Sequence, residues 1–128
     1  MSKPLSVLVV DDEPTIRLSL ETILQRAGYR VMTAERGAEA IQLLRDHRFA
    51  VAVIDLVLPD LDGLAVLDTA RRLQPKCRCL VLTAYGIQEK AMRVIQEGAF
   101  DYLVKPMPVK EILARVKHAA ANYSGPSG

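Results

Sequence analysis

Residues 51–55 read Val-Ala-Val-Ile-Asp, an apolar run with β-branched side chains that ends in one carboxylate, Asp55. The turn-forming sequence Pro-Asp-Leu-Asp-Gly follows at residues 59–63. Four apolar residues before an acid, with turn residues beyond, predict a buried strand. Asp55 then stands at the carboxyl end of that strand, where a side chain is available for chemistry.

Three further apolar runs also end in polar side chains. They are residues 7–10 before Asp11 and Asp12, residues 80–82 before Thr83, and residues 102–104 before Lys105. If these buried strands are parallel neighbours, their polar ends meet at one edge of the sheet, which is where α/β proteins bind ligands. The sequence therefore predicts one site with three acids, a hydroxyl and an ammonium group.

The segments between these runs carry apolar residues at helical spacing. The expected helices cover residues 14–27, 38–46, 64–73, 88–97 and 109–121, and an additional short strand covers residues 29–34. Their apolar stripes, which include Ala27 in the first helix and Leu73 in the third, should face the sheet. Strict alternation of strands and helices implies right-handed crossovers and a parallel sheet with helices on both faces.

The positions of the polar strand ends favour one strand order. A doubly wound, flavodoxin-like α/β fold with order 2-1-3-4-5 places the ends of strands one, three, four and five around one pocket. We therefore expect a five-stranded parallel sheet in this order, with five helices. The 128 residues suffice for a single domain, which we place at residues 1–123, followed by a flexible tail at residues 124–128.

The charge pattern limits the expected partners. The formal net charge is +2, with acids and bases interspersed, which is unlike the basic stripe that nucleic-acid binding requires. We expect no direct contact with nucleic acid, so any DNA binding would belong to another domain or polypeptide. The chain shows neither an apolar segment of membrane length nor a secretory leader, so we expect a cytoplasmic protein that does not bind membranes.

The cysteines and histidines do not form a recognisable site. Cys77 and Cys79 are one residue apart at the start of a strand, but no second Cys or His pair completes a metal site. We expect reduced, partly buried thiols. His47 and His118 stand alone in polar segments, where surface histidines are the default.

The three carboxylates need a compensating charge. Held in contact, they repel one another by about 4 kcal/mol per pair at an effective dielectric near 20. Oxygen-only ligands with room for water suit Mg²⁺. A carboxylate beside a hard cation and a lysine can attack phosphorus, so we expect phosphoryl transfer to Asp55. The plainer alternative is that the acids cap helix starts and Lys105 is a solvated strand end.

The motifs around these residues resemble the receiver domains of two-component response regulators. The resemblance runs from about residue 6 to residue 121. It rests on Val-Asp-Asp-Glu-Pro at residues 10–14, Asp55 with Leu-Pro-Asp-Leu-Asp-Gly at residues 58–63, Leu-Thr-Ala at residues 82–84, and Gly-Ala-Phe-Asp-Tyr-Leu-Val-Lys-Pro at residues 98–106. All of the positions that the family requires are filled.

The resemblance implies roles for the acidic residues. Asp55 would accept phosphate from a sensor histidine kinase or a histidine phosphotransfer protein. Asp12, Asp55 and the backbone carbonyl of Val57 would hold Mg²⁺, and Asp11 would act on the metal through water. Such a domain is a self-phosphorylating and self-dephosphorylating switch, not a turnover enzyme.

The resemblance also implies a conformational switch. Thr83 and Lys105 would bind the phosphoryl oxygens, Tyr102 would turn inward as Thr83 moves, and the Lys105–Pro106 bond would be cis. The fourth helix, fifth strand and fifth helix would then form a surface with two states. Its charged residues are a solvated face or the contacts of a phosphorylation-dependent homodimer: Lys90, Arg93, Glu97, Asp101, Arg115 and Lys117.

The sequence also bears on whether the chain is part of a longer protein and on two alternative protein classes. The chain is expected to be the N-terminal part of a transcriptional regulator, with a stand-alone receiver as the alternative. A haloacid-dehalogenase-type phosphatase would need a second acid two residues after Asp55, where this chain has Val57. A flavodoxin-like flavin carrier would need a loop rich in hydroxyls and glycines after the first strand, where acids stand instead.

Val57 and Tyr85 bear on the lifetime of the phosphorylated form. By the resemblance, the residues two after Asp55 and two after Thr83 flank the path of an attacking water. Neither Val57 nor Tyr85 can orient water as a base, and both are bulky, so general-base assistance should be absent. We therefore expect a long-lived phosphorylated state.

Overall fold

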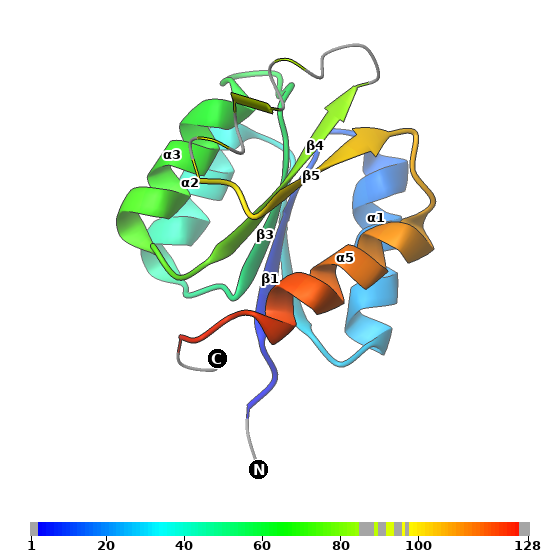
Figure 1. The fold of residues 1–128 in the computed structure, drawn as a ribbon. Helices are drawn as coiled ribbons and strands as arrows, with labels where there is room; N and C mark the ends of the chain where they lie inside the picture. Colours follow the sequence, from blue (N-terminus) through cyan, green and yellow to red (C-terminus); the bar gives the residue numbers. More distant parts are fainter. Residues whose placement is uncertain (1–2, 85–88, 90–91, 94–95, 97, 126–128) are drawn as a thin grey trace.

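The computed structural model describes residues 3–84, 89, 92, 93, 96 and 98–125. They form a five-stranded parallel sheet in the order β2-β1-β3-β4-β5 (Figure 1). The strands are β1 (Ser6–Val10), β2 (Arg30–Ala34), β3 (Val51–Asp55), β4 (Arg78–Ala84) and β5 (Asp101–Lys105). The described residues also form the helices α1 (Pro14–Arg26), α2 (Gly37–Asp46), α3 (Gly63–Leu73) and α5 (Val109–Ala121).

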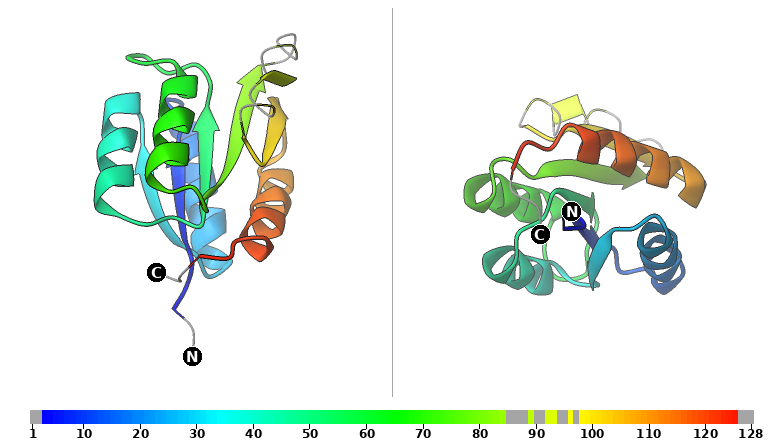
Figure 2. Two further views of the ribbon diagram at one scale, coloured as in Figure 1. Left: turned by 60° about the vertical axis from the view of Figure 1, so that its left-hand side comes forward. Right: turned by 90° about the horizontal axis from the view of Figure 1, so that it is seen from below.

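The helices cover the sheet on both faces. α2 and α3 lie on one face, and α1 and α5 on the other (Figures 1 and 2). Two apolar cores result, because side chains alternate along each strand. Val7 and Val9 point to the α1 and α5 side, whereas Leu8 and Val10 point to the α2 and α3 side. All five residues of β3 are buried, as a central strand covered on both faces requires.

The predicted fold class and strand order are confirmed. β3 and α5 have the predicted bounds, and the other described elements differ from the predictions by one or two residues at an end. The helix predicted for residues 88–97 lies mostly outside the described residues. Among the residues that are described, no helix is long and apolar enough to span a bilayer.

Two residues predicted to face the sheet are exposed. Ala27 is the C-cap of α1, one residue beyond its last turn, so its side chain does not reach the core. Leu73 is 48 % exposed, because it lies six residues after the buried Leu67 and thus about 120° around α3 from it. The buried stripe of α3 instead runs through Val66, Leu67 and Ala70.

Two strand predictions also need correction. β4 continues to Ala84, so Thr83 lies within the strand and pairs with Val104 in the register. β5 was predicted to be a buried strand, but only Leu103 in it is fully buried. The reason is that, within the described part of the chain, β5 forms the edge of the sheet and pairs with β4 alone.

Candidate functional site

The carboxyl ends of the strands bring three acids together. Asp11 and Asp12 follow β1, and Asp55 is the last residue of β3, the strand that pairs with β1. Each of the three offers a carboxylate oxygen, and these oxygens all lie within 4.8 Å of one another. Asp11 is fully buried, Asp55 is nearly so, and Asp12 is exposed, so the cluster opens to solvent on the side of Asp12.

Lys105 places its ammonium group inside this cluster. Its Nζ donates hydrogen bonds to Asp55 Oδ2 at 2.9 Å, to Asp11 Oδ2 at 3.0 Å and to Glu13 Oε1 at 3.2 Å. Glu13 was not predicted as part of the site, although its position directly after Asp11 and Asp12 was the available signal. One ammonium group thus forms hydrogen bonds with three carboxylates, and the site keeps an excess of negative charge.

The pKa shifts follow from burial and from these contacts. Burial raises the pKa of Asp11 above its usual value, against the lowering effects of the hydrogen bond from the Glu13 N–H and of Lys105. Burial acts to lower the pKa of Lys105, but its hydrogen bonds to Asp55 and Asp11 outweigh burial, so the net pKa is raised. Lys105 therefore stays charged. Burial therefore makes ionisation of the Asp11 carboxyl costly, and a bound cation would relieve that cost.

Backbone contacts hold the acids in place. The Asp11 N–H donates to Ala34 O at 3.0 Å, and Asp11 Oδ1 accepts from the Glu13 N–H at 2.9 Å. Arg17 adds a hydrogen bond to the backbone carbonyl of Asp11 at 3.0 Å. These bonds leave Asp11 Oδ2 directed at Lys105.

The backbone of Asp55 is packed directly against the start of α3. Asp55 Oδ1 accepts from the Val57 N–H at 3.0 Å, and the Gly63 N–H donates to Leu56 O at 2.9 Å. A Cβ at Gly63 would lie 2.2 Å from Asp55 O and 2.6 Å from Leu56 Cα. Position 63 therefore has no room for a side chain. Val57, the predicted source of a carbonyl ligand, is 65 % exposed beside Asp55.

The strand register places Thr83 between the two charged residues. Asp55 pairs with Leu82 and Lys105 pairs with Ala84, so Thr83 lies between their levels along β4. Thr83 is buried, and its Oγ1 lies 3.5 Å from Ala84 O, the long limit of a hydrogen bond. The hydroxyl is thus weakly held.

Tyr102 lies on the same face of the sheet as Thr83. It is half-buried and packs against the core under α2 and α3, opposite Val81 in the register. The two predicted switch residues therefore share one face of the sheet on adjacent strands, two residues apart in the register. The Lys105–Pro106 peptide bond is cis, as predicted.

Three predicted residues are outside the described part of the chain, and the exposure of a fourth differs from the prediction. Tyr85, Lys90 and Glu97 are outside them, so the predicted rim of Val57 and Tyr85 is described only at Val57. Asp101 was predicted to be exposed, but it is half-buried, because its carboxylate pairs with Arg115 across β5 and α5.

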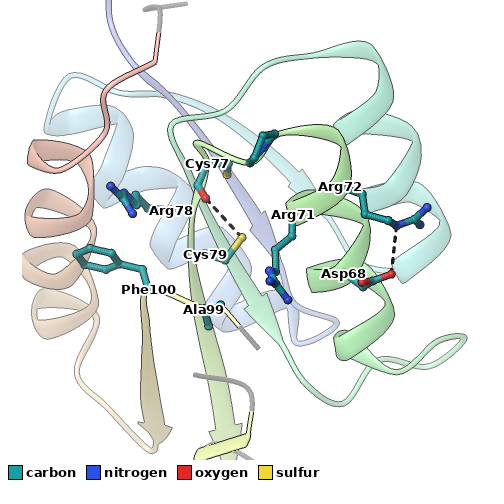
Figure 3. Close-up of a pocket in the computed structure, with 10 residues that line it drawn as sticks. Asp68, Arg71, Arg72, Cys77, Arg78, Cys79, Ala99 and Phe100 are labelled. Atoms are coloured by element: carbon teal, nitrogen blue, oxygen red, sulfur yellow. Dashed lines mark hydrogen bonds and ion pairs between the residues drawn. The ribbon is translucent and has the colours of Figure 1, made fainter. Parts of the chain in front are cut away.

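The cysteines line a separate cavity of about 560 Å³ (Figure 3). Both thiols are free, as predicted, but they are buried rather than partly buried, and Cys79 Sγ lies 4.0 Å from Cys77 O. Arg71 and Arg72 of α3 also line this cavity, but none of the clustered acids does. The contact with Cys79 and burial raise the pKa of Cys77, so its thiol is neutral. We therefore locate the functional site at the acids.

Comparisons with known proteins identify the family. The family model described as "Response regulator receiver domain" matches residues 7–117. The DNA-binding transcriptional regulator NtrC of Escherichia coli K12 is 38 % identical over 117 residues, which are 91 % of this chain and 25 % of that protein. The probable transcriptional regulatory protein TcrX of Mycobacterium tuberculosis is 36 % identical over 115 residues, covering 90 % of this chain and 49 % of TcrX.

A solved receiver-domain structure has the same fold as this chain. The receiver domain of NtrX from Brucella abortus superposes with a TM-score of 0.83 at 30 % identity, covering 90 % of this chain and 98 % of that one. The chain spans a quarter to about half of the length of the curated relatives it matches. The likeness thus concerns one domain of longer proteins. This chain belongs to the family of response regulator receiver domains.

Proposed function

We propose that Asp55 is the phosphoacceptor of this receiver domain and that Mg²⁺ is required for its phosphorylation. The observation that carries the proposal is the position of Lys105 Nζ, 2.9 Å from Asp55 Oδ2 and 3.0 Å from Asp11 Oδ2. A nucleophilic carboxylate beside a fixed ammonium group and two further acids is the arrangement that phosphoryl transfer to a carboxylate needs.

The acidic cluster fits a hard divalent cation. The oxygens of Asp11, Asp12 and Asp55 lie within 4.8 Å of one another, and Asp12 is open to solvent. We assign Asp12, Asp55 and the Val57 carbonyl as direct ligands and Asp11 as a partner through water. Bound Mg²⁺ would supply charge that neutralises the phosphoryl oxygens.

The residues of this chain then carry out the transfer. A carboxylate oxygen of Asp55 attacks phosphorus, an O–P bond forms, and the P–N bond of a phosphohistidine donor breaks. The donor imidazole leaves with the bonding electron pair and takes up a proton. Lys105 pairs with one phosphoryl oxygen, and the weakly held hydroxyl of Thr83 turns to donate to another.

The donor and the setting belong to the same proposal. We infer that a histidine kinase or a histidine phosphotransfer protein supplies the phosphoryl group and that the chain is the receiver of a longer transcriptional regulator. The regulators NtrC and TcrX among its relatives support this output. The free, buried Cys77 and Cys79 support a reducing compartment, and we place the protein in the cytoplasm.

The test is phosphorylation by a small phosphodonor, acetyl phosphate, with and without Mg²⁺. Intact mass spectrometry should show one added phosphoryl group on the parent protein and none on Asp55→Ala. Asp68→Ala is the matched control, because it removes an exposed aspartate of α3 outside the site. Stoichiometric phosphate on the Asp55→Ala protein would contradict the assignment.

A further inference from the structure

The N-terminus of α2 is capped from a distant part of the chain. Its N-cap residue, Arg36, makes no side-chain capping bond, although the first N–H groups of a helix need acceptors. Asp60 supplies acceptors for two of these N–H groups. Its Oδ1 accepts from the Gly37 N–H at 2.8 Å, and its Oδ2 accepts from the Ala38 N–H at 3.0 Å. These bonds lower the pKa of Asp60, so its carboxylate is ionised at the positive end of the helix.

Asp60 belongs to the connection that carries Val57. This loop is closed at its base, where Val57 and Asp62 form an antiparallel bridge and the Gly63 N–H donates to Leu56 O at 2.9 Å. Asp62 accepts from the Leu64 N–H at 2.9 Å and caps α3. The loop is thus held at its base by α3 and at its tip by α2, through two different aspartates.

Close packing at Gly37 allows this contact. A Cβ on Gly37 would lie 2.9 Å from both Cβ and Cδ1 of Leu61, the residue after Asp60. Because Leu61 Cβ is fixed to the loop backbone, a side chain at position 37 would push the loop away from α2. The absence of a side chain there brings the Asp60 carboxylate within bonding distance of the helix.

We propose that Asp60 is a positioning residue for the metal site: by anchoring its loop on α2, it holds the Val57 carbonyl where Mg²⁺ binds. This inference rests on the proposed function, which makes that carbonyl a ligand. Asp60 itself is not a ligand, because its two oxygens are engaged on α2 and it is outside the cluster of Asp11, Asp12 and Asp55. It acts on the metal only through the backbone of the loop.

The first test compares Asp60→Ala with Glu39→Ala by calorimetric titration with Mg²⁺. Both variants remove one carboxylate from the start of α2, since Glu39 Oε1 accepts from the Glu35 N–H at 3.0 Å. Only Asp60 is attached to the metal-site loop. Asp60→Ala should weaken Mg²⁺ binding by about tenfold. This is the low end of the loss in metal affinity that follows when a residue that orients a metal ligand is removed. Glu39→Ala should leave Mg²⁺ binding unchanged.

Two more variants examine the same contact. Asp60→Asn should retain part of the affinity, because its amide oxygen can still accept one of the two N–H bonds. Gly37→Ala places the better helix former in α2, so a purely local effect would stabilise the helix. If the loop contact matters, Gly37→Ala should weaken Mg²⁺ binding instead, and combining it with Asp60→Ala should add little further loss.

Parent-like Mg²⁺ affinity in a folded Asp60→Ala protein would overturn the inference, as would an equal loss in Glu39→Ala. Thermal unfolding of each variant shows that the compared proteins are folded. A parent protein that binds no Mg²⁺ would contradict the proposed function itself, and this inference with it. Mg²⁺ binding that is intact in the parent and in Asp60→Ala would contradict the inference alone.

Discussion

Lys105 Nζ lies 2.9 Å from Asp55 Oδ2, although the two residues are 50 positions apart in the chain. The contact joins the end of β5, at the edge of the sheet, to the end of the central strand β3. Lys105 also bonds to Asp11 and Glu13, so its ammonium group compensates part of the negative charge of the site. The charge of Lys105 should therefore affect both metal binding and phosphoryl transfer.

Replacing Lys105 should change Mg²⁺ affinity and the rate of phosphoryl transfer in opposite directions. Lys105→Met keeps a long side chain but removes a cation from beside Asp55 and Asp11, so Mg²⁺ binding should become tighter. Phosphorylation by acetyl phosphate at saturating Mg²⁺ should slow by about 100-fold, the usual effect of removing one donor to a developing charge. Mg²⁺ titration and single-turnover kinetics measure the two effects. Weaker Mg²⁺ binding together with an unchanged rate would contradict this role.

Asp11 should make the stability of the metal-free protein depend on pH. Its folded-state pKa is raised above the usual 3.8, so the folded protein holds this proton more tightly than the unfolded chain does. The contribution to stability is full below pH 3.8 and is lost as the pH rises through the folded-state pKa. Asp11→Asn should therefore raise the unfolding free energy at neutral pH by on the order of 1 kcal/mol.

Denaturant titrations of the parent and of Asp11→Asn at several pH values test this expectation. The difference between them should grow from acidic to neutral pH, and Mg²⁺ should reduce it by stabilising the parent. Asp68→Asn, an exposed aspartate on α3, is the control and should change little. If Asp11→Asn proves less stable than the parent at neutral pH, the ionised carboxylate is not a cost to the fold.

Gly63 should be required for both stability and activity. In Gly63→Ala the new Cβ would lie 2.2 Å from Asp55 O and 2.6 Å from Leu56 Cα, and both are backbone atoms. The overpacking should cost about 1–3 kcal/mol of unfolding free energy and displace Asp55. Gly28→Ala is the control, because its strain comes from a φ of +99° with no atom within 4 Å. It should lose stability but phosphorylate at the parent rate. Normal phosphorylation of Gly63→Ala would show that Asp55 tolerates the shift.

The sequence predicted the residues that stand at strand ends. Asp11, Asp12, Asp55 and Lys105 follow apolar runs, and parallel strands bring such ends together whatever the details of packing. The prediction that Leu73 faces the sheet was wrong, because the helical spacing of apolar residues alone is compatible with more than one buried face of α3. The contact of Asp60 with α2 could not be read from the sequence, because its partners are backbone N–H groups 22 and 23 residues away. They meet through tertiary packing, in which Leu61 lies close against Gly37.

The lifetime of the phosphorylated state should depend on the residue beside the acceptor. Val57 is bulky, apolar and 65 % exposed next to Asp55, so it can shield phosphorus but cannot orient a water molecule. Val57→Asn combined with Tyr85→Glu should speed dephosphorylation by about 100-fold through a polar rim that holds water. Loss of label from phosphorylated protein at constant Mg²⁺ measures this rate. A double variant that keeps its phosphate as long as the parent would show that water access at these positions does not set the lifetime.

Chemical trapping of the phosphorylated residue tests the central claim most directly. Borohydride reduces an aspartyl phosphate to homoserine and releases phosphate, whereas an unmodified aspartate does not react. After phosphorylation with acetyl phosphate and Mg²⁺, peptide mass spectrometry of the reduced protein should find homoserine at position 55. Homoserine at Asp11 or Asp12 instead, or stable phosphate on a histidine with Asp55 intact, would contradict the account.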